Sequence, residues 1–118
     1  MKIFIAGSRK FHNEIQKLQR VLKKKGIYAS TAGECDSKVK DTSASEKKAL
    51  LKAFKEINTS KIIYIYAKEG YIGKTVSMEI AYAYAKNKKI ISSEKISELS
   101  AKALIKKVQN TEDFIKRF

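Results

Sequence analysis

Residues 61–75, KIIYIYAKEGYIGKT, join an almost continuous apolar run to a glycine-containing loop that ends in Gly-Lys-Thr. The apolar run at 61–67 is typical of a strand buried on both faces, as central strands of parallel sheets are. The residues that follow, 75–86, predict a helix, because apolar and aromatic side chains recur there at helical spacing. The predicted buried stripe of that helix comprises Val76, Ile80, Ala83 and Tyr84. The stretch therefore predicts a strand, a loop and a helix in direct succession, which is the repeating unit of parallel α/β sheets.

The rest of the chain continues this alternation on both sides of the central unit. Further strands are predicted at 2–7, 27–31, 89–92 and 103–108. Further helices are predicted at 13–25, 43–57 and 111–118, with a helical turn at 96–102. Ser43 or Ser45 is the predicted cap of the second helix. The pattern predicts one domain over residues 1–118, a three-layer α/β/α sandwich whose five-stranded parallel sheet has the flavodoxin-like order 2-1-3-4-5.

The composition limits the classes of function. With 118 residues and 43% hydrophobic content, the chain suits one folded domain. A single cysteine, Cys35, excludes an intrachain disulfide, and the single histidine, His12, excludes a zinc site of His and Cys in a monomer. The apolar runs are too short for a membrane helix and the first residues do not form a signal peptide, so we expect a cytoplasmic protein. No cofactor or metal is expected.

The formal net charge of +14 raises the possibility of nucleic-acid binding. The cations are almost all lysines spread over helix surfaces, without an arginine-rich tail or a basic stretch interleaved with aromatics. We therefore favour a solvated lysine surface, with nucleic-acid binding as the alternative. Either interpretation suits attraction of small ligands that carry phosphate.

The Gly73-Lys74-Thr75 tripeptide is reminiscent of the loop that holds nucleoside triphosphates. That motif requires a glycine five residues before Gly73, but this position is Lys68, and Gly70 is too close. The predicted strands also lack a terminal aspartate that could hold magnesium. The spacing therefore excludes a triphosphate loop of this kind.

Two glycine-bearing loops, AGSRKF after the first strand and KEGYIGKT after the third, should meet at the carboxyl edge of the sheet. Glycines allow positive φ and close backbone approach, and the start of the following helix attracts anions. The predicted substrate-binding residues are Gly7, Ser8, Arg9, Gly70, Tyr71, Gly73, Lys74 and Thr75. One turn beyond Thr75, Glu79 is the predicted catalytic residue, a carboxylate among apolar neighbours that could act as nucleophile or acid–base group.

The succession of apolar strand, glycine loop and Glu79-Ile80-Ala81-Tyr82-Ala83-Tyr84-Ala85 resembles the nucleoside 2-deoxyribosyltransferase superfamily, which includes deoxynucleoside 5′-monophosphate N-glycosidases. The opening strand and turn, residues 3–8, resemble the same superfamily. The resemblance implies that Glu79 is the nucleophile on the anomeric carbon of a nucleoside or nucleotide. It also implies a homodimer, with which the tyrosine-bearing third helix is compatible.

The sequence departs from the superfamily's pattern before the third strand. The superfamily usually has an aspartate there, whereas residues 58–60 read Asn-Thr-Ser. Asp36 and Asp41 in the preceding loop are possible substitutes. The departure keeps a second hypothesis open, a nucleotide-binding module that does not catalyse. Glycosidase, binding module and nucleic-acid-binding protein are thus the three functions to distinguish.

Overall fold

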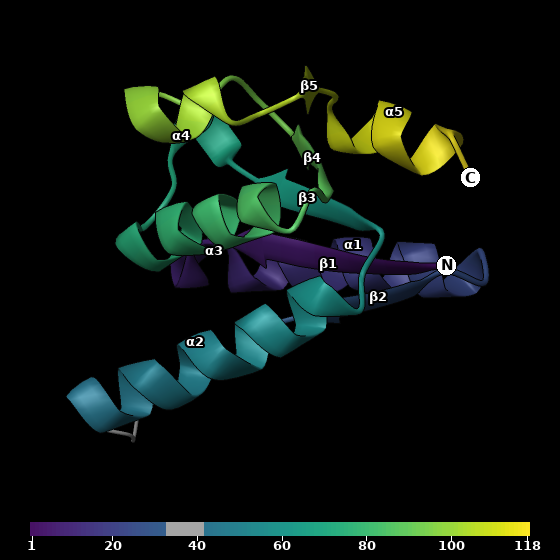
Figure 1. Ribbon diagram of the computed structural model, residues 1–118. Coiled ribbons are helices and arrows are strands. Elements are labelled where there is room, and N and C mark those ends of the chain that lie inside the picture. Colours follow the sequence, from purple (N-terminus) through teal and green to yellow (C-terminus); the bar gives the residue numbers. More distant parts are fainter. Residues whose placement is uncertain (33–41) are drawn as a thin grey trace.

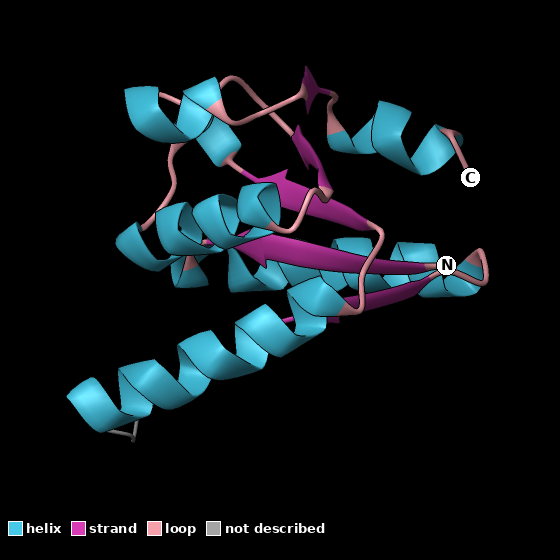
Figure 2. Ribbon diagram, viewed as in Figure 1, coloured by secondary structure: helices cyan, strands magenta, loops and turns pink. Residues whose placement is uncertain are grey.

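The computed structural model describes residues 1–32 and 42–118, which form a five-stranded sheet with helices on both faces (Figure 1). Every strand pair is parallel, and the strand order is β2-β1-β3-β4-β5. Figure 2 shows the helices packed around the magenta strands. The predicted sandwich and strand order are confirmed. Asp36 and Asp41 lie outside the described residues.

The strands agree with the predicted ones except at the end of the chain. They are β1 Lys2–Gly7, β2 Tyr28–Thr31, β3 Ile62–Tyr66, β4 Lys89–Ser92 and β5 Lys107–Val108. The predicted fifth strand at 103–108 was too long, because its first residue belongs to helix α4, Leu99–Ala103. Glu98 caps that helix by accepting a hydrogen bond from the Ala101 N–H at 2.7 Å. Helix α4 therefore lies later than the helical turn predicted at 96–102.

The remaining helices are α1 His12–Lys24, α2 Ser43–Asn58, α3 Lys74–Ala85 and α5 Thr111–Lys116, with short 3-10 helices η1 Arg9–Phe11 and η2 Lys68–Gly70. The cap of α2 is Thr42, one residue before the predicted Ser43. Its hydroxyl accepts from the Ser45 N–H at 3.1 Å, and the Ser45 hydroxyl accepts from the Thr42 N–H at 2.9 Å. This reciprocal pair is a capping box and sets the start of the helix.

The apolar core is divided by the sheet. On one face, α2, α3 and α4 cover side chains that include Phe4, Ile63 and Ile65. On the other face, α1 and α5 cover side chains that include Ile5 and Tyr64. Alternate residues of each central strand thus point to opposite faces, and both faces are buried. This explains why the central strands read as continuous apolar runs.

Helix α3 corrects the predicted buried stripe at its last member. Val76, Ile80 and Ala83 are buried as predicted, but Tyr84 is exposed and Glu79 is buried in addition. Residues 76, 79, 80 and 83 follow the three-and-four spacing of one helix face, whereas 84 lies to its side. Glu79 therefore lies on the face of α3 that packs against the sheet, and its side chain is buried.

Within the described part of the chain, no helix has the length and apolar character needed to cross a membrane.

Candidate active site

A pocket of about 130 Å³ lies at the carboxyl ends of β1 and β2, where α1 begins and where α2 and α3 pass over the sheet. The strands on either side of β1 are reached by connections on opposite faces, so this edge is the switch point at which such sheets bind ligands. The pocket contains Glu79 from α3 together with Gly7, Ser8 and Arg9 from the loop after β1. Residues 7–9 and Glu79, which are the most distant parts of the predicted site in sequence, therefore line one pocket.

Glu79 is only 5% exposed, and its carboxylate lines the pocket. Among residues 1–32 and 42–118, no hydrogen bond or ion pair reaches this carboxylate. Burial raises the pKa of the Glu79 carboxyl to about 7, since loss of water disfavours the charged form. The side chain is therefore divided between its acid and its carboxylate forms near neutral pH.

The loop after β1 supplies the anion-attracting side of the pocket. Ser8 is the cap of η1, which continues directly into α1, and its hydroxyl accepts from the Lys10 N–H at 3.4 Å. The start of a helix presents backbone N–H groups and the positive end of its dipole. An added Cβ at Gly7 would lie 2.7 Å from Ile15 Cδ1 and 3.0 Å from the Tyr66 carbonyl oxygen, so a side chain here would force its neighbours to shift. Glycine thus lets α1 approach the end of β1 closely.

Arg9 extends across the pocket toward α2. Its Nη2 lies 3.4 Å from the Glu46 Oε1, and both residues line the pocket. The pair is partly exposed, so its contribution to stability is small. The pair also fixes where the Arg9 guanidinium lies, which is beside the helix N-terminus in the same pocket.

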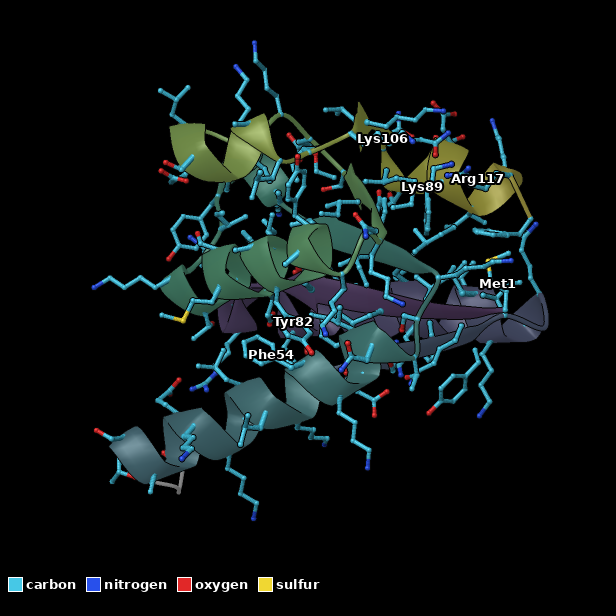
Figure 3. The ribbon with its side chains drawn as sticks, in the orientation of Figure 1. Met1, Phe54, Tyr82, Lys89, Lys106 and Arg117 are labelled. Atoms are coloured by element: carbon cyan, nitrogen blue, oxygen red, sulfur yellow. The ribbon has the colours of Figure 1, made fainter. Side chains whose placement is uncertain are left out.

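Helix α2 forms the wall opposite α1. One face of this helix contributes Glu46, Ala49, Leu50 and Ala53 at helical spacing. The two alanines leave space next to Glu79 that larger side chains would fill. Phe54 and Tyr82 stack with their ring centroids 4.2 Å apart and join α2 to α3 (Figure 3). This stack lies one turn beyond Glu79 on α3 and helps to hold the two walls at their spacing.

Four of the predicted binding residues do not line the pocket, namely Gly70, Tyr71, Gly73 and Lys74. Gly70 is buried with φ +79°, and its carbonyl accepts from the Ser97 N–H at 3.1 Å. Gly73 has φ −82°, so it does not use the positive φ that the sequence analysis expected of it. Gly70 is thus tied to the segment after β4, whereas the Tyr71 ring packs against Phe11 with the ring centroids 6.1 Å apart. Only Thr75 of this motif lines the pocket.

Two helices, α1 and α2, contribute pocket residues that were not predicted. His12 and Gln16 lie on one face of α1, four residues apart, and both line the pocket. Glu46 enters from α2. The spacing of His12 and Gln16 behind the AGSRKF loop was a usable signal. The face of α2 that lines the pocket gave no such signal, because the local sequence does not indicate which helix crosses the strand ends.

Residues 58–60, where the superfamily usually has an acid, lie at the amino end of β3 and do not line the pocket. The Asn58 Oδ1 accepts from the Tyr82 hydroxyl at 3.0 Å. In this chain the segment therefore links α2 and α3 at the edge opposite the pocket. The absence of an acid at residues 58–60 therefore does not remove a carboxylate from the pocket.

The described residues contain no group of three or more His, Cys, Asp or Glu side chains that could hold a metal ion. The acid–base groups that line the pocket within the described part of the chain are Glu79, Glu46 and His12. Its volume is below the roughly 300–1,000 Å³ of sites that enclose drug-sized ligands. A sugar ring with a small substituent such as a phosphate matches the volume of this space.

No protein-family model matches the chain, and no curated protein matches its sequence. Solved structures do match over nearly its whole length. A 2-deoxyribosyltransferase from Bacillus psychrosaccharolyticus superposes with a TM-score of 0.69 and 14% identity, covering 98% of this chain and 90% of that one. The chain has the 2-deoxyribosyltransferase fold.

Two further solved structures share this fold. The CMP N-glycosidase of Clostridium botulinum matches with a TM-score of 0.61 and 13% identity, covering 99% of this chain and 97% of that one. A conserved protein from Enterococcus faecalis V583 matches with a TM-score of 0.65 and 18% identity, covering 98% and 95%. The likeness supports the resemblance seen in the sequence at the level of the fold.

Proposed function

We propose that the protein cleaves the N-glycosidic bond of a nucleoside or nucleotide, with Glu79 as the nucleophile. The observation that carries this proposal is a buried carboxylate, unpaired among the described residues, that opens into a pocket at the carboxyl edge of the sheet. Two solved proteins with the same fold are a CMP N-glycosidase and a 2-deoxyribosyltransferase, which supports this class of reaction.

In the proposed reaction, a Glu79 carboxylate oxygen attacks the anomeric carbon as the carbon–nitrogen bond to the base breaks. The base leaves with the bonding electron pair and takes up a proton. The positive charge that develops on the sugar is stabilised by the carboxylate. Water or a second base then displaces the carboxylate from the glycosyl–enzyme ester, which gives hydrolysis or transfer.

Burial prepares Glu79 for this role. A pKa of about 7 leaves a substantial ionised fraction at neutral pH. The same burial removes the water that would otherwise solvate the carboxylate, and no hydrogen bond from the described residues holds it in place. The pocket therefore presents a weakly solvated nucleophile next to the space for a sugar.

The polar groups around that space suit a sugar or its 5′-phosphate. Ser8 and Arg9 lie at the start of η1, and Thr75 lies one turn before Glu79 on α3. A guanidinium beside a helix N-terminus favours phosphate. The proposed binding set is therefore Gly7, Ser8, Arg9 and Thr75, which is smaller than the set predicted from sequence.

The test is release of free base from deoxynucleosides and deoxynucleoside 5′-monophosphates, measured by chromatography. We expect Glu79→Gln to lower the rate about 10³-fold or more, because the nucleophile is lost. Glu56→Gln is the matched control, since Glu56 is a glutamate on the neighbouring helix α2 that does not line the pocket. Equal rates for the wild type and Glu79→Gln would exclude the assignment of Glu79.

The same panel distinguishes the non-catalytic alternative. A binding module would be stabilised by a nucleotide in a thermal-shift assay without releasing base. Arg9→Gln should then weaken the stabilisation by a 5′-monophosphate more than that by the nucleoside, because the guanidinium is assigned to phosphate. Stabilisation without turnover in the wild type would replace the glycosidase proposal with the binding module.

We also propose that the protein forms a homodimer. The outer sides of α2 and α3 expose Leu51, Met78 and Tyr84, each more than half accessible. Exposed apolar side chains on adjacent helices are consistent with an interface between copies. Sedimentation velocity of the wild type and of Met78→Lys with Tyr84→Lys tests it, and a wild-type monomer at micromolar concentration would exclude it.

A further inference from the structure

A second hollow of about 400 Å³ lies at the other side of the sheet, beside β4, β5 and α4. It shares no lining residue with the pocket of Glu79, and β3 separates the strands that border the two sites. Its volume lies within the roughly 300–1,000 Å³ typical of small-molecule sites. The proposed glycosidase reaction makes no use of it.

The walls of this hollow are apolar. Ile96, Ile105 and Val108 come from the segment after β4, from the residues after α4 and from β5. Ser92 is the one neutral polar residue of the lining, and its hydroxyl already donates to the Glu94 carbonyl at 2.8 Å. A group seated here gains from burial of apolar surface and finds few hydrogen-bond partners. An aliphatic group fits these walls better than a nucleobase.

Four lysines complete the lining of the hollow: Lys95, Lys102, Lys106 and Lys107. The Lys95 and Lys102 ammonium groups approach each other closely enough for their contact to lower the pKa of Lys102. Two nearby carboxylates are engaged with backbone N–H groups instead. Glu94 accepts from Glu69 at 3.1 Å, and Glu98 accepts from Ala101 at 2.7 Å. No described carboxylate forms an ion pair with the four lysines.

The positive region continues beyond the hollow. Figure 3 shows Lys106 on the same side of the molecule as Lys89 and Arg117. These cations are close enough that Arg117, Lys107 and Lys106 together lower the pKa of Lys89, with Arg117 acting most strongly. Like charges gathered without an ion-pair partner among the described residues create a field that attracts anions, and lysine is a common partner of phosphate.

We propose that this hollow is a binding site for a small amphiphilic polyphosphate, an aliphatic chain that ends in a diphosphate. The chain occupies the space between Ile96, Ile105 and Val108. The diphosphate lies at the mouth, between the Lys95 and Lys102 ammonium groups and within the field of Lys106 and Lys107. A ligand with both an aliphatic chain and a diphosphate should bind selectively, because only such a ligand contacts both the apolar walls and the unpaired cations. The site is independent of the proposed function.

The experiment is a titration of the isotope-labelled full chain with geranyl diphosphate, followed by ¹H–¹⁵N correlation spectra. We expect saturable shifts at the amides of Ser92, Ile96 and Ile105. Geraniol and inorganic pyrophosphate should each bind at least tenfold more weakly, since each lacks one half of the ligand. ADP, which has the same charged group on a polar ring system, should also bind more weakly.

Variants separate the site from general electrostatic attraction. Lys95→Gln with Lys102→Gln should lower the affinity for geranyl diphosphate at least tenfold. The control is Lys23→Gln with Lys24→Gln on α1, which removes the same charge from exposed positions and should change the affinity less than twofold. The spectra also show whether each variant is folded.

Three results would overturn the proposal. Shifts confined to Gly7, Thr31 and Thr75 would place the ligand in the other pocket. Equal losses of affinity in the two double variants would show attraction to net charge only. Binding of ADP or pyrophosphate as tight as that of geranyl diphosphate would show that the apolar walls do not take part.

Discussion

The two edges of the sheet each hold a glutamate from the adjacent helices α2 and α3, and the two side chains behave oppositely. At the amino edge, Glu56 forms an ion pair with Lys2, which also donates to the Thr59 hydroxyl. The hydrogen bond from Lys2 is the largest cause of the lowered pKa of Glu56. At the carboxyl edge, Glu79 has no such partner among the described residues, and burial raises its pKa to about 7.

The difference shows that the residue type did not decide the role of either glutamate. A paired carboxylate at the rim of the core stabilises the fold modestly. An unpaired carboxylate inside the core costs stability whenever it is charged. Strongly raised carboxyl pKa values are concentrated at functional sites, so the contrast supports the carboxyl edge as the candidate site.

The largest effect is expected in the pH dependence of base release. If ionised Glu79 is the nucleophile, kcat/KM should rise with pH through about 7 and fall about tenfold per pH unit below it, roughly 100-fold at pH 5. Glu56→Gln should leave the profile in place, because Glu56 lies at the other edge. Initial rates between pH 5 and 9 provide the measurement, and a profile that is flat across this range would contradict a titrating Glu79.

The second effect is on stability. Glu79 titrates near 7 when folded and near its ordinary value of 4.5 when unfolded. The folded state therefore binds more protons between these values, and stability should fall as pH rises through this window, by about 3 kcal/mol at pH 8. Glu79→Gln removes this cost.

We therefore expect Glu79→Gln to be about 3 kcal/mol more stable than the wild type at pH 8 and to differ little at pH 4. Urea unfolding at the two pH values measures the difference. A variant that is less stable than the wild type at pH 8 would show that Glu79 has a stabilising partner.

The third effect compares a glycine near each edge. Gly70→Ala should destabilise the protein by about 2–3 kcal/mol, because Gly70 has φ +79° and an added Cβ would lie 2.6 Å from the Lys95 carbonyl oxygen. Gly26→Ala is the control, since Gly26 has φ +81° with nothing within 4 Å of an added Cβ. It should cost about 1 kcal/mol. Equal losses in urea unfolding would mean that the packing of Gly70 contributes nothing.

The smallest effect is expected at the amino edge. Glu56→Gln should destabilise the protein by about 0.5 kcal/mol at neutral pH, as is usual for partly exposed ion pairs. The pKa of Glu56 is lowered on folding, so its stabilisation is present above the ordinary pKa and is lost as pH falls through the lowered one. Thermal unfolding at pH 7 and pH 2.5 measures this, and a loss that persists at pH 2.5 would not come from charge pairing.

Part of the candidate site followed from local sequence. Gly7, Ser8 and Arg9 come from a loop that a buried strand must deliver to the carboxyl edge, and Glu79 follows Thr75 by one helical turn. The rest of the predicted set does not line the pocket, and the Gly70 carbonyl instead accepts from the Ser97 N–H. That contact joins residues far apart in sequence, so no local pattern indicates it.

The sequence by itself determined the order of strands and helices and therefore the parallel sheet, because apolar runs buried on two faces and helices with one apolar face have few ways to pack. It also places Glu79 one helical turn after Thr75, in the helix that follows the third strand. Packing in three dimensions buries this carboxylate, brings two alanines of α2 into the same pocket, and leaves the carboxylate without a partner among the described residues. The physical reason is that solvation and pairing depend on neighbours brought together by packing, whereas helix and strand periodicity depend on the chain alone.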